Sequence, residues 1–264
     1  MFEAYILPVL IFAALGCAAG ILLTVVSKLF EVKTDERIQA VNDALPQVNC
    51  GACGYSGCAD YANAVVVNGV ATNLCKPGGA KSAEKIAEIL GTSVMENVPQ
   101  TAYVRCSGSC SATKPKMQFD GEQTCKAAKR FYGGSGECVY GCIGLGDCAR
   151  VCPENAICIA DGLAAVNPKA CVACGLCVKE CPNNLIAIKN MGSNLHVVSC
   201  SSHDMGKVVR AVCKNGCIGC KICEKKCEFD AVRVENNLAE IDQDKCTGCG
   251  KCAAACPAKV IKMI

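Results

Sequence analysis

The sequence predicts an α+β fold: an apolar N-terminal helix, then a small and mostly helical domain, then two tandem modules of short hairpins and helices. Residues 4–26 carry no charged side chain. The chain has 27 cysteines in 264 residues, which is several times the usual proportion. Four cysteine runs in the second half are separated by alternating apolar stretches. The predicted units are residues 1–30, 31–98, 99–137, 138–192 and 193–264.

Composition restricts the chemistry that this chain can support. Only 5% of the residues are aromatic and none is Trp, so side-chain packing alone would give small cores. The net charge is +3, with Lys and Arg scattered along the chain, which argues against a nucleic-acid partner. Only two histidines occur, His196 and His203, so they leave almost no room for histidine-based metal sites or a Ser-His-Asp catalyst. The chemistry is therefore expected to be that of cysteine.

The uncharged segment 4–26 is expected to be a transmembrane helix. As a helix it would be about 35 Å long, enough to cross a hydrocarbon core of about 30 Å. A cleavable signal sequence is disfavoured because Glu3, and no Lys or Arg, precedes the segment. Lys28 and Arg37 follow it, so the positive-inside rule predicts a single-pass protein of the cell (inner) membrane with its later domains in the cytoplasm. Thiols stay reduced there, so the later cysteines are interpreted as metal ligands, whereas Cys17 is a small apolar residue of the helix.

The second unit, residues 31–98, is predicted to place short helices around a first cysteine motif. Helices are expected over residues 35–45, 59–67 and 81–90, the last one ending at Gly91. The cysteines have the spacing C-x2-C-x4-C-x16-C, and the glycines among them let the backbone wrap closely around a cube-shaped iron–sulfur cluster. The expected ligands are Cys50, Cys53, Cys58 and Cys75.

The four later runs indicate two bacterial-type 2[4Fe–4S] ferredoxin modules. Three runs have the spacing C-x2-C-x2-C-x3-C, the signature in which the fourth cysteine ligates the other cluster of the module. Residues 231–234 and 238–241 are expected to form a hairpin about the turn Asn236-Asn237. The first run departs from the pattern with spacings of three and five, and the third run ends before Glu228 where the others have Pro; neither change removes a ligand.

Crossed ligation predicts two ligand sets in each module. They are Cys138, Cys142, Cys148 and Cys181; Cys171, Cys174, Cys177 and Cys152; Cys217, Cys220, Cys223 and Cys256; and Cys246, Cys249, Cys252 and Cys227. A zinc ribbon, the alternative metal site, uses separated C-x2-C pairs and not four cysteines in one run.

The remaining cysteines allow one further cluster, which makes five to six [4Fe–4S] clusters, with six preferred. Two segments, each bracketed by a pair of cysteines, flank the first module. These pairs suggest the ligands Cys106, Cys125, Cys200 and Cys213. Cys110 is a rival ligand, and buried thiols without metal are the other interpretation. Within the first bracket, residues 116–119 are expected to form a strand. Cys158 is expected in the core, and His203 on the surface.

The order of these parts resembles the B subunit of the Rnf complex, the ion-translocating ferredoxin:NAD oxidoreductase. The resemblance covers essentially the whole chain and rests on the apolar helix, the stretch 48–58, the stretch 140–148 and the ferredoxin runs. It implies an electron-entry subunit of a translocase, which accepts single electrons from soluble reduced ferredoxin and passes them to membrane and flavin-containing subunits. It also implies that the NAD-reducing site belongs to another subunit, so no complete catalytic site is expected on this chain.

Other function classes share some of these features. A membrane-tethered polyferredoxin that serves a hydrogenase or another dehydrogenase would have the same ligands, and a non-redox zinc scaffold or a redox sensor would use fewer clusters or none. The glycine-rich stretches 133–136 and 141–146 do not lie between a strand and a long helix, so neither is a dinucleotide fingerprint. Several lysines next to the cysteine runs are expected to act as counter-charges and docking points: Lys169, Lys179, Lys221, Lys225 and Lys251.

Overall fold

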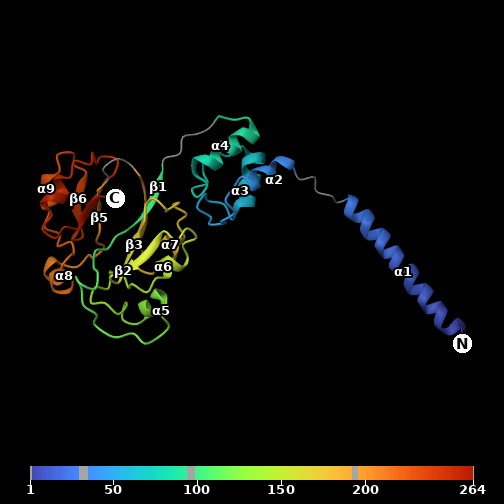
Figure 1. The fold of residues 1–264 in the computed structure, drawn as a ribbon, viewed down its shortest axis with the longest axis horizontal. Helices are drawn as coiled ribbons and strands as arrows, with labels where there is room; N and C mark the ends of the chain where they lie inside the picture. The colour runs from blue at the N-terminus through green and yellow to red at the C-terminus, as the bar shows by residue number, and fades with distance from the viewer. Residues whose placement is uncertain (1, 30–34, 94–98, 192–195, 264) are drawn as a thin grey trace.

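A computed structural model describes residues 2–29, 35–93, 99–191 and 196–263 of the chain (Figure 1). Helices alternate with four two-stranded antiparallel sheets, so the predicted mixture of helix and strand is confirmed. The described elements fall along the chain into an N-terminal helix, a helical domain and two modules that contain the sheets.

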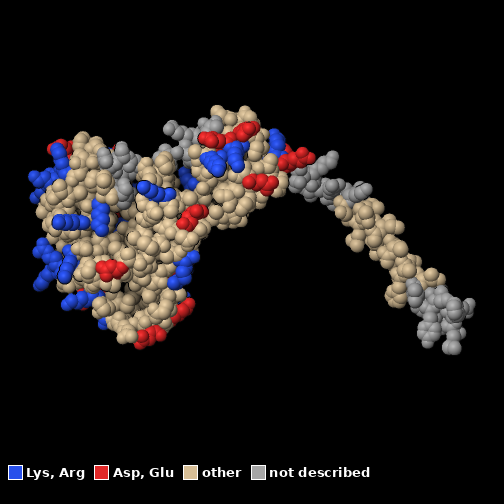
Figure 2. All heavy atoms as spheres, viewed as in Figure 1, with Lys and Arg blue, Asp and Glu red and all other residues tan. Residues whose placement is uncertain are grey.

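Helix α1 (Phe2–Leu29) stands apart from the rest of the chain. Its segment Leu10–Ser27 is long and apolar enough to cross a membrane, and none of it is buried against the protein. Large side chains such as Phe12 and Leu23 are 75% and 68% exposed, and Figure 2 shows no charged side chain on the described part of the helix. Such an apolar surface needs a lipid or protein cover, which agrees with membrane anchoring.

The helical domain consists of α2 (Glu36–Asp43), α3 (Cys58–Asn68) and α4 (Gly79–Leu90), and its three predicted helices are confirmed. Asp35 caps α2 by accepting a hydrogen bond from the Arg37 backbone N–H at 2.9 Å. The three helices pack around a small core that contains Val41, Tyr61 and Ile86, all nearly inaccessible to solvent. Cys75 belongs to the same core.

The first module begins earlier than its first cysteine run. Its elements are β1 (Gln100–Val104), α5 (Cys125–Arg130), α6 (Asp147–Arg150), β2 (Ile157–Ala160), β3 (Leu163–Val166), α7 (Leu176–Glu180) and β4 (Ile186–Asn190). Strands β2 and β3 form a hairpin, whereas β1 pairs with the distant β4, from Gln100 opposite Asn190 to Val104 opposite Ile186. The expected strand over residues 116–119 is wrong: the backbone N–H groups of Lys116 and Met117 both donate to the carbonyl oxygen of Ser135, and the segment pairs with no strand in the described chain.

The second module repeats this plan. Its elements are β5 (His196–Val198), α8 (Gly206–Val212), α9 (Ile222–Lys226), β6 (Val232–Glu235), β7 (Leu238–Ile241), α10 (Lys251–Ala255) and β8 (Ile261–Met263). The hairpin β6–β7 is confirmed, and Asn236 and Asn237 both have positive φ (47° and 64°), as a tight two-residue turn requires. Strand β5 pairs with β8, so in both modules a strand from before the first run closes on the last strand.

Each of the three units has its own small core, and cysteines form part of every core. A pair of two-stranded sheets is too small to be stable by itself in water. The burial of cysteines together with a few aliphatic side chains therefore indicates that something bound to sulfur completes each core.

One close backbone contact fixes the loop between Cys142 and Cys148. Gly144 has a φ of 82°, and a β-carbon there would lie 2.5 Å from the carbonyl oxygen of Gly162 in the turn of the β2–β3 hairpin. A side chain at this position would therefore both adopt an unfavourable conformation and collide with backbone.

We expect Gly144→Ala to lower the free energy of unfolding by about 1–3 kcal/mol. The matched control is Gly136→Ala, because a β-carbon at Gly136 would meet nothing within 4 Å. Anaerobic urea unfolding followed by circular dichroism measures both changes. Equal midpoints for the two variants would contradict the close contact.

Candidate metal centres

In the helical domain the structure brings the four predicted cysteines together. The loop that carries Cys50 and Cys53 leads into α3, which begins at Cys58, and Asn49 holds this turn by accepting a hydrogen bond from the Cys58 backbone N–H at 2.8 Å. Burial raises the pKa of the Cys75 thiol, and the three neighbouring cysteines act in the same direction. A β-carbon at Gly78 would lie 3.1 Å from the sulfur of Cys75, so the backbone is close to this thiol.

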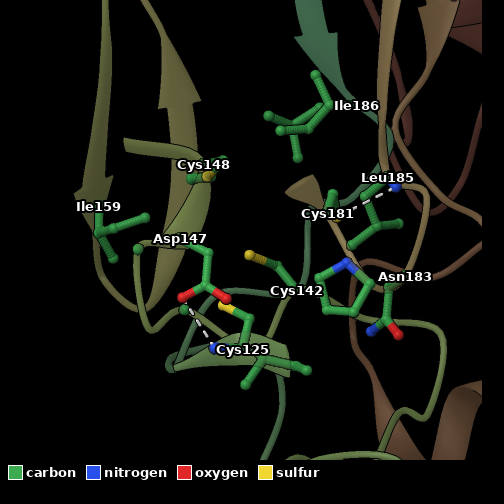
Figure 3. A pocket seen from close by; sticks show the side chains of 15 residues that line it. Cys125, Cys142, Asp147, Cys148, Ile159, Cys181, Asn183, Leu185 and Ile186 are labelled. Atoms are coloured by element: carbon green, nitrogen blue, oxygen red, sulfur yellow. Dashed lines mark hydrogen bonds between the residues drawn. The ribbon is translucent and has the colours of Figure 1, made fainter. Parts of the chain in front are cut away.

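The first module contains a cavity lined by four cysteines, and one of them differs from the predicted set. Figure 3 shows Cys125, Cys142, Cys148 and Cys181 around this cavity, with Ile159 and Ile186 beside them. Burial raises the pKa of Cys148 to about 12, and the nearby Cys142, Cys125 and Cys181 contribute to the shift. The sequence predicts Cys138 in this set; in the structure Cys125 lines the cavity with the other three cysteines and Cys138 lines another one, so the ligand grouping stays a prediction.

Asp147 explains why Cys125 lies in this cavity. The Asp147 carboxylate is buried at 4% exposure and accepts hydrogen bonds from the backbone N–H groups of Cys125 (3.0 Å) and Lys126 (3.1 Å) (Figure 3). It also pairs with the guanidinium of Arg150. The first turn of α5 is therefore held against α6, and the thiol of Cys125 comes beside Cys148.

A second cavity lies between the two modules. It is lined by Cys106, Cys138, Cys200 and Cys213, together with Cys142 at its border with the first cavity. Burial raises the pKa of Cys106 to about 11, and the Cys106 sulfur accepts hydrogen bonds from the backbone N–H groups of Gly108 and Cys142, both at 3.4 Å. Burial also raises the pKa of Cys138, with Cys200 and Cys213 as the nearest like-charged groups. Three of the four cysteines suggested for a sixth centre thus meet here, with Cys138 in place of Cys125.

Two of the other cysteines lie outside these cavities. Cys110 is exposed and packs its sulfur on the β2–β3 turn, where a β-carbon at Gly162 would lie 2.4 Å from it. Cys158 is exposed on strand β2, so its expected place in the core is wrong, because its side of the hairpin faces away from the packed interior. His203 is exposed, as expected, and interacts through its Nδ1 with the carbonyl oxygen of Asn236 at 3.2 Å.

The cysteines of the other predicted sets also lie close together, and their crossed ligation of clusters stays a prediction. Cys177 has its pKa raised to about 11 by burial, with contributions from Cys174, Cys171 and Cys152. In the second module, a cavity is lined by Cys217, Cys220, Cys223 and Cys256. Burial raises the pKa of Cys252, and Cys246 and Cys227 lie near it.

The donor sets fit iron–sulfur clusters. Within the described ranges, no three His, Cys, Asp or Glu side chains converge closely enough to hold a single metal ion, whereas groups of four thiols line cavities. Backbone N–H groups point at several sulfurs, including those of Cys171 (from Ala102, 3.4 Å), Cys152 (from Ala156, 3.3 Å) and Cys181 (from Leu185, 3.4 Å). Such N–H donors stabilise anionic sulfur around a cluster. Burial keeps the free thiols protonated, so ligation of metal releases protons.

Hydrogen bonds connect several neighbouring cysteine groups. The Lys179 ammonium donates to the carbonyl oxygen of Cys50 at 3.2 Å and so joins the first module to the helical domain. The Cys142 backbone N–H donates to Cys106 and thereby links the first module to the intermodule cavity. The Cys217 backbone N–H donates to Cys200 at 3.3 Å and links that cavity to the second module.

Comparisons with known proteins agree with this geometry. A family model described as a putative Fe-S cluster matches residues 45–77, and two models described as 4Fe-4S binding domains match residues 164–187 and 238–261. The B subunit of the ion-translocating oxidoreductase complex of Methanosarcina acetivorans is 41% identical over 264 residues, which cover 100% of both chains. The chain belongs to the family of Rnf B subunits.

Two further relatives show the breadth of the Rnf B-subunit family. The B subunit of the Na(+)-translocating ferredoxin:NAD(+) oxidoreductase complex of Acetobacterium woodii is 41% identical over 262 residues, covering 99% of this chain and 78% of that protein. The B subunit of the proton-translocating ferredoxin:NAD(+) oxidoreductase complex of Clostridium ljungdahlii is 41% identical over 263 residues, with 98% and 92% covered. The family resemblance predicted from the sequence is thus confirmed, and the matched domains support [4Fe–4S] clusters in this chain.

The position of Asp147 generates a testable prediction. We expect Asp147→Ala to weaken the fold by about 2 kcal/mol, since two buried N–H groups and Arg150 lose a charged acceptor. The variant should also lose iron bound next to Cys125, which anaerobic iron analysis measures. Asp120→Ala is the control, because Asp120 is exposed and, among the described residues, its carboxylate accepts a hydrogen bond from the Gln118 amide alone. Full iron retention in Asp147→Ala would contradict the proposed anchoring of Cys125.

Proposed function

We propose that this chain takes single electrons from a soluble reduced ferredoxin and passes them to membrane partners of an ion-pumping ferredoxin:NAD oxidoreductase complex. The observation that carries the proposal is the series of contacts that links cysteine groups of the second module, the first module and the helical domain. The printed names of the Acetobacterium and Clostridium relatives support the ferredoxin and NAD parts of the proposal.

Six [4Fe–4S] clusters are proposed, with ligand sets that follow the cavities. The sets are Cys50, Cys53, Cys58 and Cys75; Cys152, Cys171, Cys174 and Cys177; Cys125, Cys142, Cys148 and Cys181; Cys106, Cys138, Cys200 and Cys213; Cys217, Cys220, Cys223 and Cys256; and Cys227, Cys246, Cys249 and Cys252. The fourth set joins the two modules, so it would both hold them together and complete the electron path.

The proposed role of the residues of this chain in electron transfer is to hold the clusters in position. When bound, [4Fe–4S] clusters supply reversible one-electron chemistry. The thiols fix the spacing between neighbouring centres, and the backbone N–H groups at Cys106, Cys171 and Cys200 offset the negative charge on sulfur. Nine of these ligands are buried and thirteen are half-buried, which limits the access of water to the clusters. The chain is proposed to have no catalytic site of its own, so the flavin, NAD and ion sites would belong to partner subunits.

The proposed membrane topology has α1 in the bilayer and the cluster-bearing domains in the cytoplasm. The uncharged segment of α1 supports the anchor, and the basic residues that follow it support the orientation. A soluble carrier would then meet the clusters on the cytoplasmic side, while the helical domain lies nearest the membrane partners.

The ligand sets can be tested with a double variant. The wild type is expected to hold about 24 iron atoms per chain, which is four for each of six clusters. Cys106 and Cys138 share one cavity, so Cys106→Ala with Cys138→Ala should remove one cluster and leave about 20 iron atoms. The grouping from the sequence would lose two clusters and leave about 16. Iron and acid-labile sulfide analysis of anaerobically prepared protein separates these outcomes, and zinc in place of iron would overturn the proposal.

Electron transfer itself can be tested in the purified complex. Replacement of Cys53 by Ala should abolish the cluster nearest the membrane partners, because one of its ligands is lost. Ferredoxin should still reduce the clusters of the two modules, seen by EPR, while NAD reduction should fall at least 100-fold. The control is Cys110→Ala, whose thiol lines neither cavity and should leave both signals unchanged. Normal NAD reduction in the Cys53 variant would show that electrons leave by another route.

A further inference from the structure

The second module holds the proposed ligands that are open to solvent. Among the cysteines assigned to clusters, Cys220 and Cys249 are exposed, and the rest are buried or half-buried. Cys220 lies just before α9, which Figure 1 shows at the end of the molecule away from the helical domain and α1. Electrons arriving from a soluble carrier cross the shortest gap where a ligand reaches the surface, so this end of the chain is the natural point of entry.

Unpaired lysines surround the first of these cysteines. Lys221, Lys225 and Lys226 are exposed, and in the described part of the chain no carboxylate lies within ion-pair distance of them. Two acidic side chains of the same segment are engaged: Glu224 accepts from the Val234 backbone N–H at 3.3 Å, and Glu228 pairs with Lys251 at 2.6 Å, whereas Asp230 is exposed. Figure 2 shows that Lys and Arg side chains gather along the edge where α8 and α9 lie.

Lys221 has a left-handed backbone conformation at the start of α9, where the chain turns into the helix. Lys221 has a φ of 58°, in the left-handed region that favours glycine. The equivalent positions in the neighbouring runs, directly after the second cysteine, are Gly175 with φ 77° and Gly250 with φ 73°. A lysine where glycine is easier costs folding energy, and such strain is typical of positions that serve a function.

Apolar side chains complete the surface. Ile222, next to Lys221, is 38% exposed, and Phe229 beyond the end of α9 is 45% exposed. An apolar centre with a charged rim is the usual composition of a protein interface, and electron-transfer interfaces are small.

We propose that this face docks an acidic, soluble one-electron carrier. We call it the α9 face, and it consists of Cys220, Lys221, Ile222, Lys225, Lys226 and Phe229. The inference rests on the proposed function and adds to it the place on the chain where the carrier binds. The lysines attract the carboxylates of the carrier and raise the association rate. Ile222 and Phe229 exclude water from the contact. Cys220 offers a short route for the electron to the cluster. The binding depends on salt, because exposed charges are screened.

The test measures binding without electron transfer. Full-length holoprotein in nanodiscs is titrated with an oxidised, acidic 2[4Fe–4S] ferredoxin by calorimetry at low ionic strength. Lys225→Glu with Lys226→Glu should raise the dissociation constant at least tenfold, and the difference should shrink to about twofold in 0.5 M salt. Lys81→Glu with Lys85→Glu is the matched control: both lysines are exposed on α4, and this double variant should bind almost as the wild type does.

Lys221→Gly separates docking from folding. It relieves the left-handed backbone, so the urea midpoint should be unchanged or higher, and iron content should stay complete. Ferredoxin should nevertheless bind about threefold more weakly, while Lys221→Arg should bind as the wild type does. A merely structural role for Lys221 would give the opposite result for stability and no change in binding.

The outcomes distinguish an error in the docking face from an error in the proposed function. If ferredoxin reduces the wild type but the α9 variants bind as tightly as it does, the docking face is wrong and the proposed function stands. If the α4 control loses affinity as much as the α9 variant, only net charge matters and the face is wrong as well. If the wild type with complete clusters is neither bound nor reduced by ferredoxin, both proposals fall.

Discussion

The burial of thiols around shared cavities is the constraint on which the rest of this structure depends. The cysteines occupy places that aliphatic side chains fill in other small domains, and each core contains several of them. Burial and neighbouring sulfurs raise the pKa of Cys148 to about 12 and of Cys223 to about 11, so these thiols do not ionise by themselves at neutral pH. Ligation of metal supplies the missing charge and completes the core, and such ligation can contribute on the order of 10 kcal/mol to folding. Folding of the chain and binding of the clusters are therefore thermodynamically coupled.

The same constraint organises the two modules into a rigid conductor. Strands β1 and β5 each come from before a module and close on its last strand, so the chain between them is held at both ends. The intermodule cavity takes Cys106 and Cys138 from one side and Cys200 and Cys213 from the other. A centre in this cavity ties the modules at the place where an electron must cross between them. One structural element would thus serve both rigidity and conduction.

The path has chemically different ends. At one end, the exposed Cys220 directly precedes Lys221, which has no ion-pair partner among the described residues, and a soluble acidic partner can approach there. At the other end, Lys179 reaches the carbonyl oxygen of Cys50, and the helical domain leads to the apolar helix. A cation between two anionic centres stabilises their close approach. In the proposed function such a chain would need no catalytic residue, because its task would be to keep one-electron centres dry, close and in order.

The sequence by itself determined the chemistry and the local elements, and the tertiary structure decided which distant residues meet. The spacing of the cysteine runs indicated iron–sulfur clusters because close ligands of one cluster come from one turn of chain. Asn236-Asn237 predicted its hairpin for the same local reason. The pairing of β1 with β4, and the exchange of Cys125 for Cys138, could not be predicted in this way. The spacings of the first run differ from the standard pattern, so the sequence does not show which cavity Cys138 lines. Nothing in the sequence indicates that the Asp147 carboxylate binds the backbone of Cys125. Long-range contacts of this kind follow from the packing of whole elements, which only the folded chain defines.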